Sequence, residues 1–247
     1  MAATPAGKAV GVNPSAQAVL AATTKTLVVG SDVTMGDKIV TGASGQVQLV
    51  FNDDTHLVVG PSSSLVIESY LLRSDKTVGK FAVNALGGTF RFITGKSDHA
   101  AYTINTPTGT IGVRGTAFDF TIGDPHGVPG PHGVPGPHGV PGLLPGTNVA
   151  LFLGSVLLCD LEEKHCVTLD HKCDAGVINS DEALRIGHFK AVEEGLRNHF
   201  HYILSQSPLL PEFRLDTARF CFISANPPAN GLSTVLNGAV QPYQRSY

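Results

Sequence analysis

Three cysteines and a histidine in the second half of the chain have the clearest capacity for chemistry. Cys159, Cys166, His171 and Cys173 are ligand types of a Cys3His zinc site. Zinc knuckles bring two ligands together across two to four residues, whereas six residues separate Cys159 from Cys166. Those six residues also fit a hairpin turn, across which a disulfide forms easily. With Cys221 the chain has four cysteines, so two disulfides in one of three pairings are the alternative to zinc.

Two adjacent carboxylates and one arginine are the next candidates. A glycosidase needs carboxyls that face each other across about 5–9 Å. Asp53 and Asp54 are neighbours, so in a strand they would point to opposite faces, and Asn-Asp-Asp-Thr is ordinary turn chemistry. Arg114 has the forked guanidinium that binds anions, but a half-buried arginine that tethers a turn is the simpler interpretation. No nucleophile elbow, phosphate loop or dinucleotide fingerprint occurs, so we predict no catalytic residue and no cofactor.

Histidines also recur in a repeat of Pro-His-Gly-Val-Pro-Gly, at His126, His132 and His138. Periodic histidines can bind metal, but a surface loop lengthened by repetition explains them with fewer assumptions. Glycine takes every third position from Gly127 to Gly142, as a collagen-type helix requires. We expect this tract to lie in polyproline II and to contact a neighbouring copy in a homo-oligomer or filament. A passive surface loop is the alternative.

Composition excludes several classes of protein. The chain has 247 residues, of which 42% are hydrophobic and 15% charged, with a net charge of −3. A nucleic-acid binder usually carries a basic face, and no Lys/Arg cluster occurs here. No apolar stretch approaches the roughly 18 to 20 residues of a membrane span. The first residues lack the charged start and apolar run of a signal peptide, so either the chain is cytoplasmic or its signal was removed before Met1.

Short runs of β-forming residues separated by turn residues dominate the chain from Thr26 to Ile122, which predicts a mainly β fold. Gln46 to Phe51 alternates polar and apolar residues as a half-buried strand does, and Thr89 to Ile93 places Phe90 and Phe92 on one face. The expected strands are 27–29, 38–41, 46–51, 56–59, 65–68, 80–83, 89–93, 102–105, 117–122, 149–153, 156–159, 166–169 and 218–223.

The flanking segments have other patterns. Residues 1–25 are rich in small residues and predict a loosely docked arm. Residues 180–205 predict an amphipathic helix, because Phe189, Val192, Leu196 and Phe200 recur at spacings of three and four. Asn179 and Glu182 fit a capping box at its start.

Several motifs in this order resemble the FecR domain of bacterial regulators and exported proteins. The motif most similar to the family is Gly112-Val113-Arg114-Gly115-Thr116, which follows Thr110-Ile111. Earlier matching blocks are Gly36 to Gly42 (GDKIVTG), Gly45 to Leu49 (GQVQL), Phe51 to Thr55 (FNDDT) and Gly60 to Ser63 (GPSS). Each block alone is weak, but their order and spacing are specific.

The resemblance implies a β-solenoid-like or two-layered β domain over residues 26–178, interrupted by the Gly/Pro-rich loop at 125–146. Residues 179–247 would form a C-terminal helix and tail. It also implies a periplasmic or extracellular, non-enzymatic interaction or structural module, whose partner is another copy or another envelope protein. A ligand or signal sensor related to FecR-type iron-uptake regulation is the alternative.

The resemblance also bears on the cysteines. Because members of this family are usually exported, two disulfides are the default in an oxidising compartment. Among the three pairings, we predict Cys159–Cys166 and Cys173–Cys221.

Overall fold

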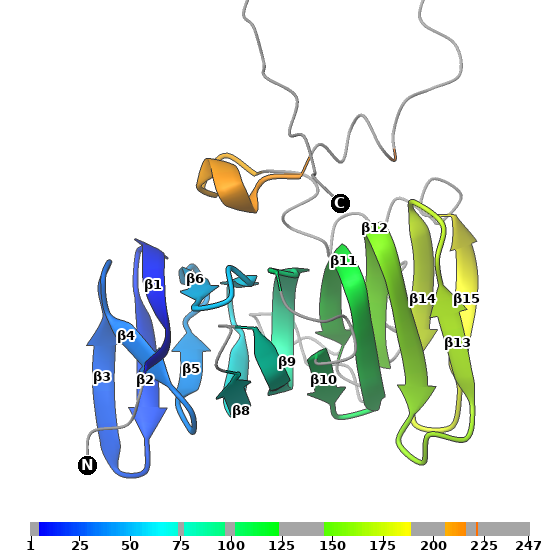
Figure 1. Cartoon of the computed structure of the whole chain (residues 1–247), viewed down its shortest axis with the longest axis horizontal. Coiled ribbons are helices and arrows are strands. Elements are labelled where there is room, and N and C mark those ends of the chain that lie inside the picture. The colour runs from blue at the N-terminus through cyan, green and yellow to red at the C-terminus, as the bar shows by residue number, and fades with distance from the viewer. Residues whose placement is uncertain are drawn as a thin grey trace, which may run out of the picture.

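The computed structural model describes residues 5–73, 77–96, 102–123, 146–188 and 206–215, together with Cys221. Nearly all the regular structure in these residues is strand (Figure 1). The strands are β1 (Pro5–Asn13), β2 (Ala16–Leu20), β3 (Thr23–Leu27), β4 (Asp32–Thr34), β5 (Lys38–Thr41), β6 (Gln46–Phe51), β7 (His56–Val59), β8 (Ser64–Leu72), β9 (Val78–Ile93), β10 (Tyr102–Thr106), β11 (Gly109–Gly123), β12 (Gly146–Asp160), β13 (Cys166–Leu169), β14 (Asp174–Ile178) and β15 (Ala183–His188). A short 3-10 helix, η2, spans Pro211–Phe213.

The strands form two layers that share three long strands. One layer has the order β4-β1-β6-β7-β9-β11-β12-β14-β15, and the other has the order β3-β2-β5-β8-β9-β10-β11-β12-β13. Strand β9 pairs with β8 and β10 through its first part, and with β7 and β11 through its second part. The fold is therefore mainly β and two-layered, with a sheet that does not close on itself; a solenoid is not confirmed.

Glycine marks the point where β9 passes from one layer to the other. Gly88 has φ +103°, a backbone conformation that side chains other than glycine rarely adopt. A Cβ at this position would lie 2.5 Å from the Cα of Ser63, so the close approach also requires glycine. The amide of Thr89 then donates to the Ser63 hydroxyl at 2.9 Å, which holds the corner against β8.

Aromatic side chains fill the space between the layers. Phe51 of β6 meets Phe81 of β9 edge-on, with ring centroids 4.8 Å apart, and Phe81 also contacts Phe92 and Tyr102. Phe90 and Phe92 lie on the same inner face, as predicted from their alternation, and Phe90 stacks on Phe120. Such pairs favour tilted and edge-to-face geometry and add to the free energy gained by burying the rings.

Two predictions about the start of the chain are corrected. Residues 5–20 are not a loose arm: β1 pairs with both β4 and β6, and β2 pairs with β3 and β5. The small residues there allow β1 to lie close to β6, since a Cβ at Gly7 would lie 2.8 Å from the Cα of Phe51. The first strand of the predicted set also ends earlier than expected, because Val28 and Val29 follow β3 and are exposed.

The predicted helix begins instead as strand β15, which pairs with β14. The Asn179 side chain accepts hydrogen bonds from the amides of Asp181 and Glu182, as a helix cap would. Here the same bonds close a hairpin turn, because the Asn179 amide also donates to the carbonyl of Glu182. The rest of that helix, the expected strand at 218–223 apart from Cys221, and the Gly/Pro tract at 125–142 lie outside the described residues.

Candidate interaction surface

The outer side of the β6–β7–β9–β11 layer carries a row of side chains that strand alternation directs away from the core. They are Gln48 of β6, Val58 of β7, Arg91 of β9 and Asp119 of β11, and each is buried. Three of them, Gln48, Val58 and Arg91, contact the segment of residues 206–215, called the strap below, which contains η2 (Figure 1, orange). Much of a surface that alternation would leave in water is therefore covered by a segment far away in the sequence.

An ion pair lies at the centre of this surface. Arg91 Nε and Nη2 donate to the two carboxylate oxygens of Asp119 at 2.6 and 2.8 Å, and both side chains are 0% exposed. Complete burial raises the pKa of the Asp119 carboxyl, although the charge and hydrogen bonds of Arg91 oppose the rise. The Arg91 guanidinium also lies 5.7 Å from the centre of the Phe152 ring.

The remaining guanidinium nitrogen of Arg91 holds the strap. Nη1 donates to the side-chain oxygen of Gln206 at 2.5 Å and to the backbone carbonyl of Phe213 at 3.2 Å. Gln206 in turn bonds both backbone groups of Leu215, which closes the strap into a loop. Arg91 therefore joins the sheet to both ends of the strap.

Gln48 and two apolar side chains supply the other contacts. The Gln48 side chain accepts from the amide of Leu210 at 2.7 Å and donates to the carbonyl of Pro208 at 3.3 Å. Leu209 and Phe213, each 1% exposed, pack on Val58. The strap is thus fixed by backbone hydrogen bonds and by two apolar side chains four residues apart.

All four cysteines form disulfides, paired as predicted: Cys159 with Cys166, and Cys173 with Cys221. The first bridge crosses the β12–β13 hairpin. The second lies in an outer-face cluster with Ala150, Phe152 and Ala175. Sulfurs bonded in this way are not available as the thiolate ligands that the Cys3His zinc alternative needs.

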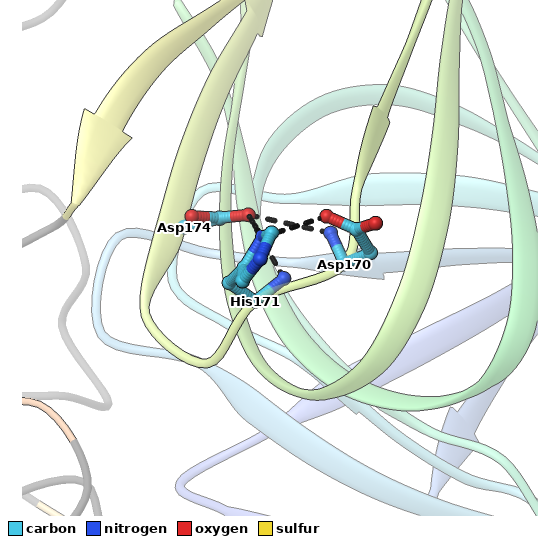
Figure 2. A group of neighbouring side chains, drawn as sticks. All are labelled: Asp170, His171 and Asp174. Atoms are coloured by element: carbon cyan, nitrogen blue, oxygen red, sulfur yellow. Dashed lines mark hydrogen bonds and ion pairs between the residues drawn. The ribbon is translucent and has the colours of Figure 1, made fainter.

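His171, the fourth residue of that zinc set, lies in a polar cluster with Asp170 and Asp174 (Figure 2). Its Nδ1 is 2.8 Å from Asp170 and 3.6 Å from Asp174. The guanidinium of Arg185 already contacts this cluster, at 2.7 Å from Asp174 and 2.9 Å from His171 Nδ1. The arginine balances the acidic charge that a metal ion would otherwise neutralise.

The Asp53 carboxylate is held in a buried network. It accepts from the hydroxyls of Tyr102 at 2.5 Å, Thr55 at 2.8 Å and Tyr70 at 3.3 Å. Burial raises the pKa of Tyr70 above its ordinary value, and the Asp53 charge adds to the rise, so Tyr70 stays a neutral donor. Asp54 points elsewhere and pairs with exposed Lys96. The arrangement connects the two layers, as expected for a structural turn.

The motif from Gly112 to Thr116 forms the corner where β11 changes layers. Gly115 has φ +61° at a bulge in the β11–β12 pairing. The Thr116 amide donates to the Thr94 hydroxyl at 2.9 Å, and the Thr94 amide donates back to the Thr116 carbonyl at 3.0 Å. Arg114 is exposed, so the prediction that this arginine is half-buried is wrong.

Sequence reasoning did not identify Gln48, Arg91, Asp119 or the strap as a unit. One signal was present: Arg91 stands between Phe90 and Phe92 in a strand, as Gln48 stands between Val47 and Leu49. Alternation of this kind is also typical of a solvent-facing side. The partners at 206–215 are more than a hundred residues away from Arg91, and no local pattern links them.

Comparison with known proteins agrees with the motif analysis. Residues 37–128 match the family model described as FecR protein. This part of the chain is similar to a FecR domain. Its matched part runs from the start of β5 through β11, and so includes Gln48, Arg91 and Asp119 but not the strap. A search of the curated proteins finds no match.

Two crystal structures of a candidate anti-sigma factor from Parabacteroides distasonis are similar to part of this chain. Each is 13% identical to this chain, with TM-scores of 0.41 and 0.42. The alignments cover 61% of this chain and 59% of the other, so the chain spans about three fifths of that protein. Likeness at this level carries no argument about function. No helix within the described ranges has the length and apolar character to cross a membrane.

Proposed function

We propose that this chain is a non-enzymatic protein-interaction module that works outside the cytoplasm in a regulatory, signal-related role. The FecR match over residues 37–128 carries the proposal. Proteins of this kind act through contacts with other envelope proteins, as the resemblance implies. The two disulfides support an oxidising compartment, because thiols in the cytoplasm are kept reduced.

The distribution of polar and apolar groups supports binding rather than catalysis. The carboxylates Asp53 and Asp119 are both used in buried structural contacts. Four of the nine exposed large apolar side chains of the described residues lie on or next to the strands β2, β3 and β4. Leu20, Val28, Val29 and Met35 are 43%, 62%, 68% and 46% exposed. Such groups suit contact with another protein.

Fractionation and crosslinking in the native cells test the proposal. We expect the chain in an extracytoplasmic fraction with both disulfides formed. A photoreactive residue at exposed Val29 should give a discrete adduct with another protein, whereas the same residue at Glu162, in the charged β12–β13 turn, should not. Recovery from the cytoplasm with four free thiols would contradict the proposal, as would equal labelling from both positions.

A ligand or signal sensor of the FecR type is the second candidate, and the same family match favours it. It would be supported if the gene lay beside genes for a sigma factor and an outer-membrane receptor. Self-assembly into a homo-oligomer or filament through the Pro-His-Gly-Val-Pro-Gly tract stays a prediction. Deletion of residues 125–142 followed by sizing and electron microscopy tests it, since unchanged assembly would make the tract a passive insertion.

A further inference from the structure

The contacts under the strap have the character of peptide recognition. We propose that the outer face around Gln48, Val58 and Arg91 is a docking surface for a short, looped peptide segment of another protein, and that the strap occupies it as an internal ligand. This inference rests on the proposed interaction function and adds to it a second contact surface, separate from the exposed residues around Val29. The partner segment competes with the strap for the same contacts.

The surface forms hydrogen bonds with backbone N–H and C=O groups, which any peptide has. Gln48 uses both groups of its side-chain amide, on the carbonyl of Pro208 and the amide of Leu210. Arg91 Nη1 donates to the carbonyl of Phe213. These hydrogen bonds do not depend on the identity of the three strap residues, except that a proline at the position of Leu210 would remove the donor.

Two apolar side chains define the specificity. Leu209 and Phe213 are almost fully buried against Val58, and the Phe213 ring meets His56 edge-on at 4.8 Å. Their neighbours Leu210 and Glu212 are exposed. The matching partner therefore carries an aliphatic residue, then an aromatic residue four positions later, with a free backbone amide directly after the first.

The strap can leave without unfolding the sheet. It is not part of the described strand ladders, so its release breaks no strand pairing of β6, β7 or β9. Segments held this way open locally at a lower free energy than global unfolding requires. Release also returns water to the Arg91–Asp119 pair, which offsets part of the cost of exposing Val58.

The disulfide keeps a released strap close to the surface. Cys221 is bonded to Cys173 of the sheet, and only residues 216–220 separate it from the end of the strap. A tether of this length gives an effective concentration of order millimolar. The strap therefore weakens binding of the partner segment, and weakening the strap should strengthen that binding.

Fluorescence anisotropy with a labelled peptide of residues 206–215 tests this competition. The full chain carrying Leu209→Ala and Phe213→Ala should bind the peptide at least about tenfold more tightly than the unchanged chain, because the internal competitor is weakened. The matched control, Leu210→Ala with Glu212→Ala, changes exposed strap residues and should behave like the unchanged chain. Adding Gln48→Ala to the first variant should lower its affinity severalfold.

Three results would overturn the proposal. One is no binding to the Leu209→Ala/Phe213→Ala chain while its circular dichroism shows an intact β fold. Another is equal affinity for this variant and the unchanged chain. The third is equal binding of a peptide that itself carries alanine in place of Leu209 and Phe213.

Hydrogen exchange on the unchanged chain provides a test that does not depend on the variant folding. The strap amides of Leu210 and Leu215 should exchange at least about tenfold faster than the paired amides of β7. Equal protection would mean that the strap opens only with the sheet and would overturn the proposal. The proposed function would survive that failure, because localisation and the Val29 crosslink test it independently.

Discussion

Arg91 and Asp119 are a buried ion pair, and removing one partner of such a pair is costly. Arg91→Met would leave the Asp119 carboxylate without its bidentate partner, and we expect a loss of about 3–5 kcal/mol in unfolding free energy at pH 7. Urea unfolding measures it. Glu162→Ala, which removes an exposed ion pair with Lys164, is the control and should change stability by at most about 0.5 kcal/mol.

The same variant has a predictable pH dependence. Without Arg91, burial raises the pKa of Asp119 further, so the folded pKa exceeds the unfolded pKa of about 3.9. A carboxyl of this kind penalises folding above its unfolded pKa, and the penalty grows until pH passes the folded pKa. The loss should therefore be smaller at pH 4 than at pH 7. An equal loss of unfolding free energy at pH 4 and at pH 7 would contradict a charged Asp119 in the variant.

Asp160 has the opposite behaviour. Burial acts to raise its pKa, but hydrogen bonds from the His165 ring and from the amides of Lys164 and His165 outweigh it and lower the pKa. Its stabilising contribution is present above the unfolded pKa and is lost as pH falls through the folded one. Asp160→Asn should lower the thermal midpoint at pH 7 and have less effect near pH 3. Asp181→Asn, at an exposed turn, should show no such difference.

At the scale of the elements, the bend of β9 depends on one glycine of a pair. Gly88→Ala places a Cβ against Ser63 at φ +103° and should cost about 1–3 kcal/mol. Gly87→Ala, one residue earlier, meets no atom within 4 Å and should cost less than about 1 kcal/mol. Denaturant unfolding of both variants compares them. Similar losses would show that the corner tolerates a side chain at either position.

At the scale of the whole molecule, the two disulfides should contribute unequally. Cys173–Cys221 joins residues 48 apart in sequence, and Cys159–Cys166 joins residues 7 apart. In the chain-entropy model, loops of these lengths correspond to about 4 and about 2 kcal/mol. Replacing each pair by serine and measuring unfolding free energy tests the order. A larger loss from the Cys159/Cys166 pair would contradict it.

The local pattern of residue types was sufficient to predict many of the strands. β5, β6, β7 and β13 have the predicted bounds, because turn residues enclose short β-forming runs. Long strands were predicted in pieces: 80–83 and 89–93 are one strand, β9, whose bend carries two glycines that resemble a turn. The segment from Gly112 to Thr116 was recognised from the sequence as a family motif, but its position at the corner of β11 is visible only in the pairing of β11 with β12.

The sequence by itself determined the mainly β class, most strand positions, the family resemblance and the candidate disulfides, since each depends on neighbouring residues or on residue counts. Only the tertiary structure decided that residues 5–20 join the sheet and that β15 replaces the start of a helix. It also decided that Gln48 and Arg91 lie beneath the strap. Strand alternation specifies which side a residue faces, but what covers that side depends on chain segments distant in sequence, and an amphipathic pattern is satisfied equally by water or by a docked segment.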